Sequence, residues 1–394
     1  MTGRTPSTHI DQFWGKDYLF ITPTELHQSY HINYSEKKIS ETGMREIGLK
    51  KIGNISILVG CIGWDMGNVG VVNKKCAFNQ QINAITNFSE SYNPYYIYYL
   101  LSGKKELFRR IAGVTRTPIL KKSDFENIEL IVPDRTMQDR IATLLKQFDD
   151  KIALNNRVNA TLEAMAKTLY DYWFVQFDFP DEKGRPYKTS GGKMVYNEEL
   201  GREIPAGWDV VPLQAIAHIV QGNSPEGETL NETGDGMVFY QGKADFGFRF
   251  PDVRTYTTSP YRIAEKFDTL LSVRAPVGSV NMAREKCCIG RGLAAIRCDF
   301  PSFMYYTLMK IQPHLEKYSG IGTTFNAITK DDIMAFIILQ PHRSQISHFE
   351  KIVSNYDKDI MCRTEENRRL AALRDWLLPM LMNGQVGFKG ASNE

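Results

Sequence analysis

Basic and amide side chains recur at matching places in the two halves of this 394-residue sequence. Lysine and arginine attract phosphate whatever the base sequence, and arginine, asparagine and glutamine in loops can form paired hydrogen bonds with base edges. A net charge of +3 permits such binding without demanding it. For each residue, a solvated surface charge is the alternative. The candidate DNA contacts are Lys74, Lys75, Asn79, Gln80, Arg109, Arg110, Arg116 and Lys121 in the first half, and Lys243, Arg249, Arg274, Arg284, Lys286 and Arg291 in the second.

The two halves differ most clearly at one short segment. Residues 79–81 read Asn-Gln-Gln, whereas the matching residues 290–292 read Gly-Arg-Gly within an otherwise similar framework. A shared framework with different tips is what two readers of different short DNA sequences need.

No grouping of catalytic side chains is apparent. Residues 93–96 read Asn-Pro-Tyr-Tyr, close to the Asn/Asp-Pro-Pro-Tyr loop that holds a flipped adenine in amino-methyltransferases, but the second proline is absent. The matching residues 300–303 read Phe-Pro-Ser-Phe, and a helix start explains both copies. The seven histidines are scattered, and no glycine-rich loop has the spacing of a phosphate or adenosyl site. The sequence therefore predicts a binding protein, with a methyltransferase as the enzymatic alternative.

The elements that must position these residues are used twice. Residues 75–85 match residues 286–296 without a gap at an offset of 211, and residues 94–101 match 301–308 at 207. Residues 148–152 match 356–360 at 208, and residues 3–6 match 222–225 at 219. A long unit used twice predicts two similar modules related by a pseudo-twofold axis, and duplex DNA is the leading candidate partner.

Each repeat combines a mixed α/β part with a long helix. Short apolar runs such as residues 55–59, 128–132 and 270–273 are typical of strands, and residues 94–111 and 301–318 are typical of helices. Apolar residues then recur in steps of four and three from 141 to 173 and from 349 to 381, which predicts two heptad seams. About 40 helical residues span roughly 60 Å, so the two helices can lie antiparallel as a spacer.

Both seams are polar in the middle, at Asn155 and Asn159 in the first and at Arg363 and Asn367 in the second. Buried polar residues would fix the register of the two helices at a cost in stability. Exposure at a bend is the alternative, and the sequence leaves both open.

Composition sets the outer limits. Hydrophobic content of 42% and charged content of 24% are those of an ordinary soluble protein, and no apolar run is long enough to span a membrane. The six cysteines form no Cys-x-x-Cys pair and have no histidine at zinc-ligand spacing, so we expect buried free thiols in a reducing cytoplasm.

Four stretches resemble the specificity subunit of type I restriction–modification systems. Residues 204–208 (Ile-Pro-Ala-Gly-Trp) are similar to the segment that enters a target-recognition domain of that family. Residues 271–278 and 289–294 are similar to two of its strand-and-turn motifs, and residues 138–152 to the start of its central helix. Together these stretches span nearly the whole chain.

The resemblance implies an α+β protein with two target-recognition domains, each binding half of a split DNA target, and two antiparallel helices as a coiled-coil spacer. It implies no cofactor in this chain. S-adenosylmethionine would be carried by two adenine methyltransferase subunits docked on this chain, and ATP and Mg would belong to the restriction (translocase–nuclease) subunits that join through them. The expected segments are recognition domain 1 (1–132), central helix (133–180), flexible linker (181–203), recognition domain 2 (204–342), C-terminal helix (343–386) and tail (387–394).

The first module departs from this pattern because it has no counterpart of residues 204–208, and the tail beyond Gln385 could close its edge near Thr2. The alternative from another functional class is a coiled-coil scaffold whose two modules bind proteins and which has no role with DNA.

Overall fold

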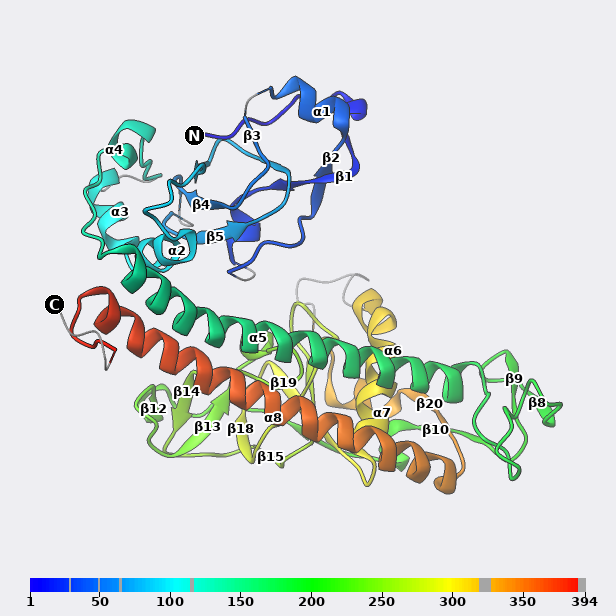
Figure 1. Cartoon of the computed structure of the whole chain (residues 1–394). Helices are drawn as coiled ribbons and strands as arrows, with labels where there is room; N and C mark the ends of the chain where they lie inside the picture. The colour runs from blue at the N-terminus through cyan, green and yellow to red at the C-terminus, as the bar shows by residue number, and fades with distance from the viewer. Residues whose placement is uncertain (28–29, 49, 64–65, 114–116, 319–326, 389–394) are drawn as a thin grey trace. The chain divides into compact units, whose positions relative to one another are not determined.

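The computed structural model describes residues 1–27, 30–48, 50–63, 66–113, 117–318 and 327–388 (Figure 1). The chain forms two compact units. Unit 1 comprises residues 1–155 and 366–394, and unit 2 comprises residues 156–365. Each unit therefore combines one α/β module with one end of each of the two long helices. These units differ from the expected segments because the modules pack on the helices and leave no separate helical domain.

The described residues of unit 1 form two small sheets and four short α-helices. The strands are β1 (Trp14–Ile21), β2 (Lys37–Ile39), β3 (Lys51–Ile52), β4 (Ser56–Gly60), β5 (Val69–Val72), β6 (Cys76–Phe78) and β7 (Ile82–Ile85). The helices are α1 (Glu41–Glu46), α2 (Pro94–Ser102), α3 (Lys105–Ala112) and α4 (Lys122–Glu126).

Unit 2 has more strands. They are β8 (Met194–Asn197), β9 (Arg202–Pro205), β10 (Asp209–Pro212), β11 (His218–Gln221), β12 (Leu230–Asn231), β13 (Met237–Tyr240), β14 (Thr255–Thr257), β15 (Ile263–Ala264), β16 (Thr269–Ser272), β17 (Val280–Met282), β18 (Cys287–Ile289), β19 (Leu293–Arg297) and β20 (Ile337–Gln340). Its shorter helices are α6 (Pro301–Tyr318) and α7 (Lys330–Ala335).

The two units repeat the same sheet topology. One sheet has the order β2-β1-β6-β3 in unit 1, and the strands of unit 2 follow the same order, β14-β13-β18-β15, with β12 added at one edge. The other sheet has the order β5-β4-β7 in unit 1 and β17-β16-β19 in unit 2, with β11 added. In both units the first sheet holds one parallel pair, β1 with β6 and β13 with β18. The internal repeat predicted from the sequence is therefore present in the fold.

Equivalent backbone hydrogen bonds support the alignment at the offset of 219. The amide of Gly3 donates to the carbonyl of Ile82 at 3.2 Å, and the amide of Gly222 donates to the carbonyl of Leu293 at 2.9 Å. Both glycines are needed for close approach, because a Cβ on either would lie 2.2 Å from a backbone oxygen of the facing loop. The matched tetrapeptides 3–6 and 222–225 thus occupy equivalent places in the two units.

The segment expected to be a flexible linker is folded. Residues 194–205 form the antiparallel hairpin β8–β9, and the ring of Phe179 stacks on Trp208 with centroids 5.1 Å apart. Its polar and glycine-rich composition predicted flexibility. The flanking Phe179 and Trp208 are buried in the core of unit 2, whereas residues 181–203 themselves are exposed or half-buried. Residues 194–203 therefore belong to a hairpin, and the role of residues 181–203 as a linker stays a prediction.

The long helices are α5 (Arg135–Tyr170), which ends in a π-helical turn (Asp171–Val175), and α8 (Arg343–Met382). Contacts within each unit show that they run antiparallel. In unit 1, Asn155 Nδ2 donates to Asn367 Oδ1 at 2.8 Å. In unit 2, the ring of Tyr170 lies 5.9 Å from that of Phe349. Asn155 is fully buried and Asn159 is 3% exposed, so the middle of this seam is buried and does not face solvent at a bend.

A buried aspartate stands at the same place on each long helix. In unit 1, Asp149 of α5 accepts a hydrogen bond from Tyr99 at 2.6 Å and forms an ion pair with Arg374 of α8. In unit 2, the equivalent Asp357 of α8 lies 3.0 Å from the guanidinium of Arg249. The two units thus neutralise equivalent carboxylates with arginines from different elements.

The Arg249 cluster joins three elements of unit 2. The guanidinium lies 2.7 Å from Glu163 of α5 and 3.0 Å from Asp357 of α8, and it stacks over the ring of Tyr305 at 4.0 Å. Burial raises the pKa of the Glu163 and Asp357 carboxyls above their ordinary values, although the arginine charge opposes this. The cluster fixes the module of unit 2 on both helices by charge.

We predict that Arg249→Ala lowers the free energy of unfolding by about 3–5 kcal/mol, because it leaves two buried carboxyl groups without their cation. Arg254→Ala is the matched control, since Arg254 is exposed, and its effect should be within about 0.5 kcal/mol. Urea denaturation of the purified chain measures both values. Equal effects of the two substitutions would show that the cluster does not hold unit 2 together.

Candidate DNA interface

The parallel strand pair of each unit brings separate loops to one edge. The carboxyl ends of parallel strands meet at the same edge, so the segments that follow β1 and β6, or β13 and β18, must be neighbours. The amide of Asn79 donates to the carbonyl of Ile21 at 3.0 Å, and the amide of Gly290 to that of Tyr240 at 2.8 Å. We call these loop clusters tip 1 (residues 3–5 and 79–81) and tip 2 (residues 222–224, 241–245 and 290–292).

Each tip is braced by the repeated tetrapeptide. In tip 1, the hydroxyl of Thr5 donates to Gln80 Oε1 at 2.7 Å. In tip 2, the amide of Arg291 donates to the hydroxyl of Ser224 at 3.4 Å. Sequence reasoning found residues 3–6 and 222–225 only as part of the repeat and did not include them in the site. The signal that could have found them is the repeat of Gly-x-(Thr/Ser)-Pro in both halves. Such a repeat outside any pattern of buried apolar residues indicates a turn that the fold requires.

Tip 2 presents three cations to solvent. Lys243 and Arg291 are exposed on its loops, and exposed Arg274 lies beside it, because the amide of Val273 donates to the carbonyl of Gly292 at 2.9 Å. Within the described residues none of these three side chains forms an ion pair with a carboxylate. Tip 2 therefore combines unneutralised positive charge with two guanidinium groups that can donate to acceptors in pairs.

In tip 1 the loop after β6 carries three amides, and the exposed Arg4 on the other segment lies 3.5 Å from Glu46. Gln80 is exposed and Asn79 is half-buried. The side-chain Oδ1 of Asn79 accepts a hydrogen bond from the backbone amide of Gln81 at 3.0 Å. The backbone amide of Leu120, the neighbour of Lys121, donates to the carbonyl of Cys61. The backbone amide of Cys61 in turn donates to the carbonyl of Gln81. These bonds bring the exposed Lys121 close to the tip. Arg116 lies outside the described residues.

At the opposite edge of the same sheets, three of the candidate cations lie beside carboxylates. Residues just before β6 and β18 lie at the other end of the strands from the tips. There, Lys75 lies 3.6 Å from Glu41, and Lys286 lies 3.0 Å from Glu265. The hydrogen bond from Tyr18 is the main cause that lowers the pKa of Glu41, so this carboxylate stays charged beside Lys75.

Arg284 belongs to the same edge. Its guanidinium lies 2.7 Å from Glu285 and 3.0 Å from Glu365 of α8, so this edge in unit 2 faces the helix. Lys74 is exposed at the corresponding turn of unit 1. On α3, Arg110 is exposed and Arg109 lies 2.9 Å from Glu106.

One candidate is wrong as a surface contact. Arg249 has a fully buried side chain held by Glu163 and Asp357, and its guanidinium cannot reach a ligand outside unit 2. The sequence showed a basic residue near a turn, but its two carboxylate partners lie far away along the chain.

The described residues contain no group of three or more His, Cys, Asp or Glu side chains placed to hold a metal ion. Cys61 and Cys76 are buried free thiols, and burial raises their pKa values to about 11 and about 12. Cys362 is exposed, which the sequence did not predict. No helix among the described residues is long and apolar enough to cross a membrane.

Comparison with known proteins identifies a family to which this chain is similar. Residues 1–164 match the model of the type I restriction modification DNA specificity domain. A protein of Methanocaldococcus jannaschii named as the MjaX specificity subunit of a type I restriction enzyme is 32% identical, over 75% of this chain and 69% of the relative. The MjaIX specificity subunit of the same organism is 28% identical over 98% of this chain and 90% of the relative.

The chain belongs to the specificity subunits of type I restriction enzymes. The crystal structure of a type I restriction–modification S subunit from M. genitalium aligns with 97% of this specificity subunit and with 92% of the M. genitalium chain. The TM-score of 0.58 at 17% identity shows a shared fold. Membership identifies this chain as a DNA sequence-recognition subunit, and it confirms the family resemblance of the sequence and its mixed α+β class.

We predict that Gly222→Ala disturbs tip 2 and costs about 1–3 kcal/mol of unfolding free energy, because its Cβ would lie 2.2 Å from the backbone oxygen of Gly290. Gly227→Ala is the matched control in the same unit, since a Cβ there meets no atom within 4 Å. Thermal and urea unfolding measure the difference. If both variants are as stable as the parent chain, the packing of tip 2 described above is incorrect.

Proposed function

We propose that each tip of this specificity subunit reads one half of a bipartite DNA target. The observation that carries the proposal is that two units with the same strand order differ in the loop after the matched strand, which reads Asn-Gln-Gln at residues 79–81 of tip 1 and Gly-Arg-Gly at residues 290–292 of tip 2. Asparagine and glutamine suit adenine, and arginine suits guanine, in the major groove. A duplicated framework with different tips fits recognition of two different half-sites.

The charge distribution supports the choice of the tip edge as the DNA-facing one. At tip 2, Arg274, Arg291 and Lys243 form no ion pair with a described carboxylate. At the opposite edge, nearby carboxylates offset the charges of Lys75, Arg284 and Lys286. A neutralised edge attracts phosphate only weakly, because the field there is the sum of both charges. In unit 2 the charge therefore favours tip 2 over the opposite edge, whereas unit 1 has an exposed lysine near each edge, Lys121 and Lys74.

The two long helices would set the gap between the half-sites. Each helix contributes residues to both units, and the seam of α5 holds the buried Asn155 and Asn159. A change of register would break the hydrogen bonds that Asn155 Nδ2 donates to Asn367 and Glu366, so these bonds favour the observed register. A fixed register gives a fixed gap.

The outer face of α5 offers a docking surface for methyltransferase subunits. A shallow groove of about 670 Å³ in unit 2 is lined by Ala160, Ala164, Met165 and Tyr172, with Met165 48% exposed and Tyr172 38% exposed. Arg157 also lines this groove, whereas Glu163 of the same helix lies against Arg249.

In this proposal the chain carries no catalytic centre. Two adenine methyltransferase subunits would bring S-adenosylmethionine, and restriction subunits joined through them would bring ATP and Mg. A coiled-coil scaffold without a DNA role remains the competing function, and it predicts no salt-dependent binding to DNA.

We predict that Arg274→Ala and Arg291→Ala each weaken specific DNA binding by about tenfold or more, since a paired base contact contributes about 1–3 kcal/mol. Lys286→Ala and Lys75→Ala are controls at the opposite edge and should change the affinity less than about threefold. Fluorescence anisotropy of the assembled complex at several salt concentrations measures all four. Equal losses at both edges would reject the tips as the reading surface, and no salt-dependent affinity for any DNA would favour the scaffold.

We also predict that Met165→Asp weakens binding of the methyltransferase subunit by about tenfold to a hundredfold, because a buried methionine contributes about 1.5–3 kcal/mol. Tyr196→Asp, at a 67% exposed position on the hairpin β8–β9, is the control. Co-purification and titration calorimetry give the affinities. Unchanged binding of the Met165 variant would exclude this groove as the docking surface.

A further inference from the structure

Three backbone segments meet at tip 2, and the loop that carries Arg291 lies in the middle. On one side of this loop, the amide of Asn223 donates to the carbonyl of Ile289 at 3.0 Å. On the other side, the backbone of Gln241 passes so close that a Cβ on Gly290 would lie 3.1 Å from its Cα. Asn223 and Gln241 therefore flank the Arg291 loop.

The backbone of the third segment is fixed from two directions. A Cβ on Gly292 would lie 2.6 Å from the carbonyl oxygen of Gln241, so only glycine allows this approach. The carboxylate of Asp245 accepts a hydrogen bond from the amide of Gln241 at 2.7 Å. These contacts hold the backbone of Gln241 in one place and leave its side chain out of the packing.

Each of the three segments presents one polar side chain to solvent. Asn223, Gln241 and Arg291 are all exposed. Within the described residues none of the three side chains forms a hydrogen bond or an ion pair. Neighbouring segments lie about 4.8 Å apart, so the three span roughly 10 Å. Stacked base pairs are about 3.4 Å apart, and the three side chains can therefore cover about three neighbouring base pairs.

The equivalent side chains of tip 1 are engaged within unit 1. Thr22 follows β1 as Gln241 follows β13, and the hydroxyl of Thr22 donates to Glu25 at 2.7 Å. Arg4 holds the place of the other flanking amide and lies 3.5 Å from Glu46. Among the described residues, two unengaged side chains on either side of the central reader are thus found at tip 2 and not at tip 1.

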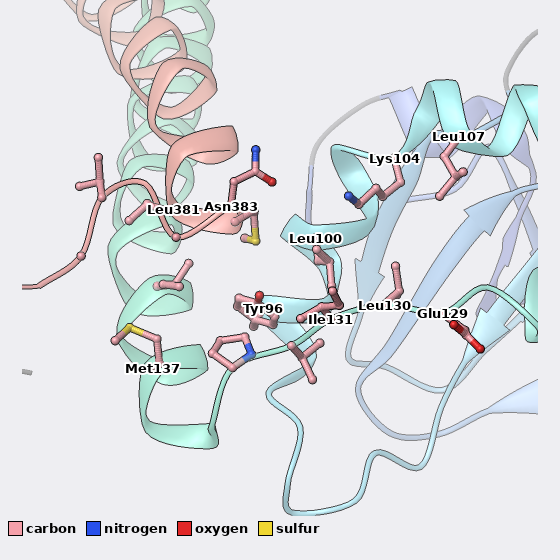
Figure 2. A pocket seen from close by; sticks show the side chains of 17 residues that line it. Tyr96, Leu100, Lys104, Leu107, Glu129, Leu130, Ile131, Met137, Leu381 and Asn383 are labelled. Atoms are coloured by element: carbon pink, nitrogen blue, oxygen red, sulfur yellow. The ribbon is translucent and has the colours of Figure 1, made fainter. Parts of the chain in front are cut away.

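The largely apolar groove of unit 1 offers DNA no comparable set of side chains. Figure 2 shows this groove, which has a volume of about 680 Å³ and a lining that includes Tyr96, Leu100, Met137 and Leu381. Its charged lining residues are one lysine and one glutamate, Lys104 and Glu129. The charges of the groove therefore cancel, whereas exposed Lys243 adds positive charge to tip 2.

We propose that Asn223 and Gln241 read the bases on either side of the base read by Arg291. This inference rests on the proposed reading of a half-site by tip 2. In the major groove, arginine pairs with O6 and N7 of guanine, and asparagine or glutamine pairs with N6 and N7 of adenine. The half-site of tip 2 therefore holds a G·C pair between two A·T pairs, and Lys243 supplies attraction to phosphate.

Selection from a random library of DNA duplexes, by the complex of this chain with its methyltransferase subunits, tests the proposal. The parent complex should select a half-site with a G·C pair between two A·T pairs. Asn223→Ala should relax the selection at one flanking pair and Gln241→Ala at the other, each by about tenfold, because a paired base contact is lost. Both side chains are exposed, so neither substitution removes a packing contact of unit 2.

Gln214→Ala is the matched control. Gln214 is an exposed amide of unit 2 that precedes β11, at the end of that strand away from tip 2. This variant should select the same sequences as the parent complex. A relaxed half-site with Gln214→Ala would show that loss of any exposed amide has this effect and would overturn the assignment.

Arg291→Ala is made in parallel, because relaxation of the central G·C pair identifies the half-site of tip 2. If this variant selects the parent sequence, the proposed function of tip 2 fails, and this inference fails with it. If it relaxes the half-site but both amide variants select the parent sequence, the function of tip 2 stands and only this inference is overturned. Amide variants that bind every sequence equally more weakly would indicate phosphate contacts, which would overturn it as well.

Discussion

The parallel pairing of β1 with β6, and of β13 with β18, is the constraint on which the candidate site depends. Antiparallel neighbours would place the two following loops at opposite edges, whereas parallel neighbours place them together. In both units this pairing brings a chain segment from early in the module beside the loop that follows β6 or β18. The repeated Gly-x-(Thr/Ser)-Pro segment then braces that loop. Different side chains can occupy the tip without any change to the sheet beneath it.

A second constraint is the polar seam of the long helices. Asn155 is buried inside the helix pair and bonds the half-buried Asn367 and Glu366 of α8, although burying an apolar residue there would cost less in desolvation. Equivalent aspartates, Asp149 and Asp357, are neutralised on either side of this seam by Arg374 and Arg249. We interpret these buried polar contacts as devices that give the helices one register, because any other register would leave several polar groups unpaired.

The fold could be predicted from the sequence in the features that local patterns or the repeat determine. The offset of 211 predicted two units with one topology, and the steps of four and three predicted both long helices. Periodicity could not decide whether Asn155 was buried, because burial depends on the facing helix. Composition suggested a flexible linker at residues 181–203, but residues 194–205 pair as a hairpin, and the flanking Phe179 and Trp208 stack on each other. For the site, residue type indicated Arg291 and Gln80 as readily as Arg249 and Lys286, and only tertiary contacts separate exposed cations from ion-paired ones.

The central claim is that two tips on one repeated framework read two separate half-sites at a fixed distance. The most direct measurement is a genome-wide map of methylated adenines produced by this chain co-purified with its adenine methyltransferase, before and after residues 1–132 are exchanged for those of another member of the family. The account predicts a split motif with a constant gap, of which only one half changes on exchange. A continuous motif, a variable gap or a change in both halves would contradict it.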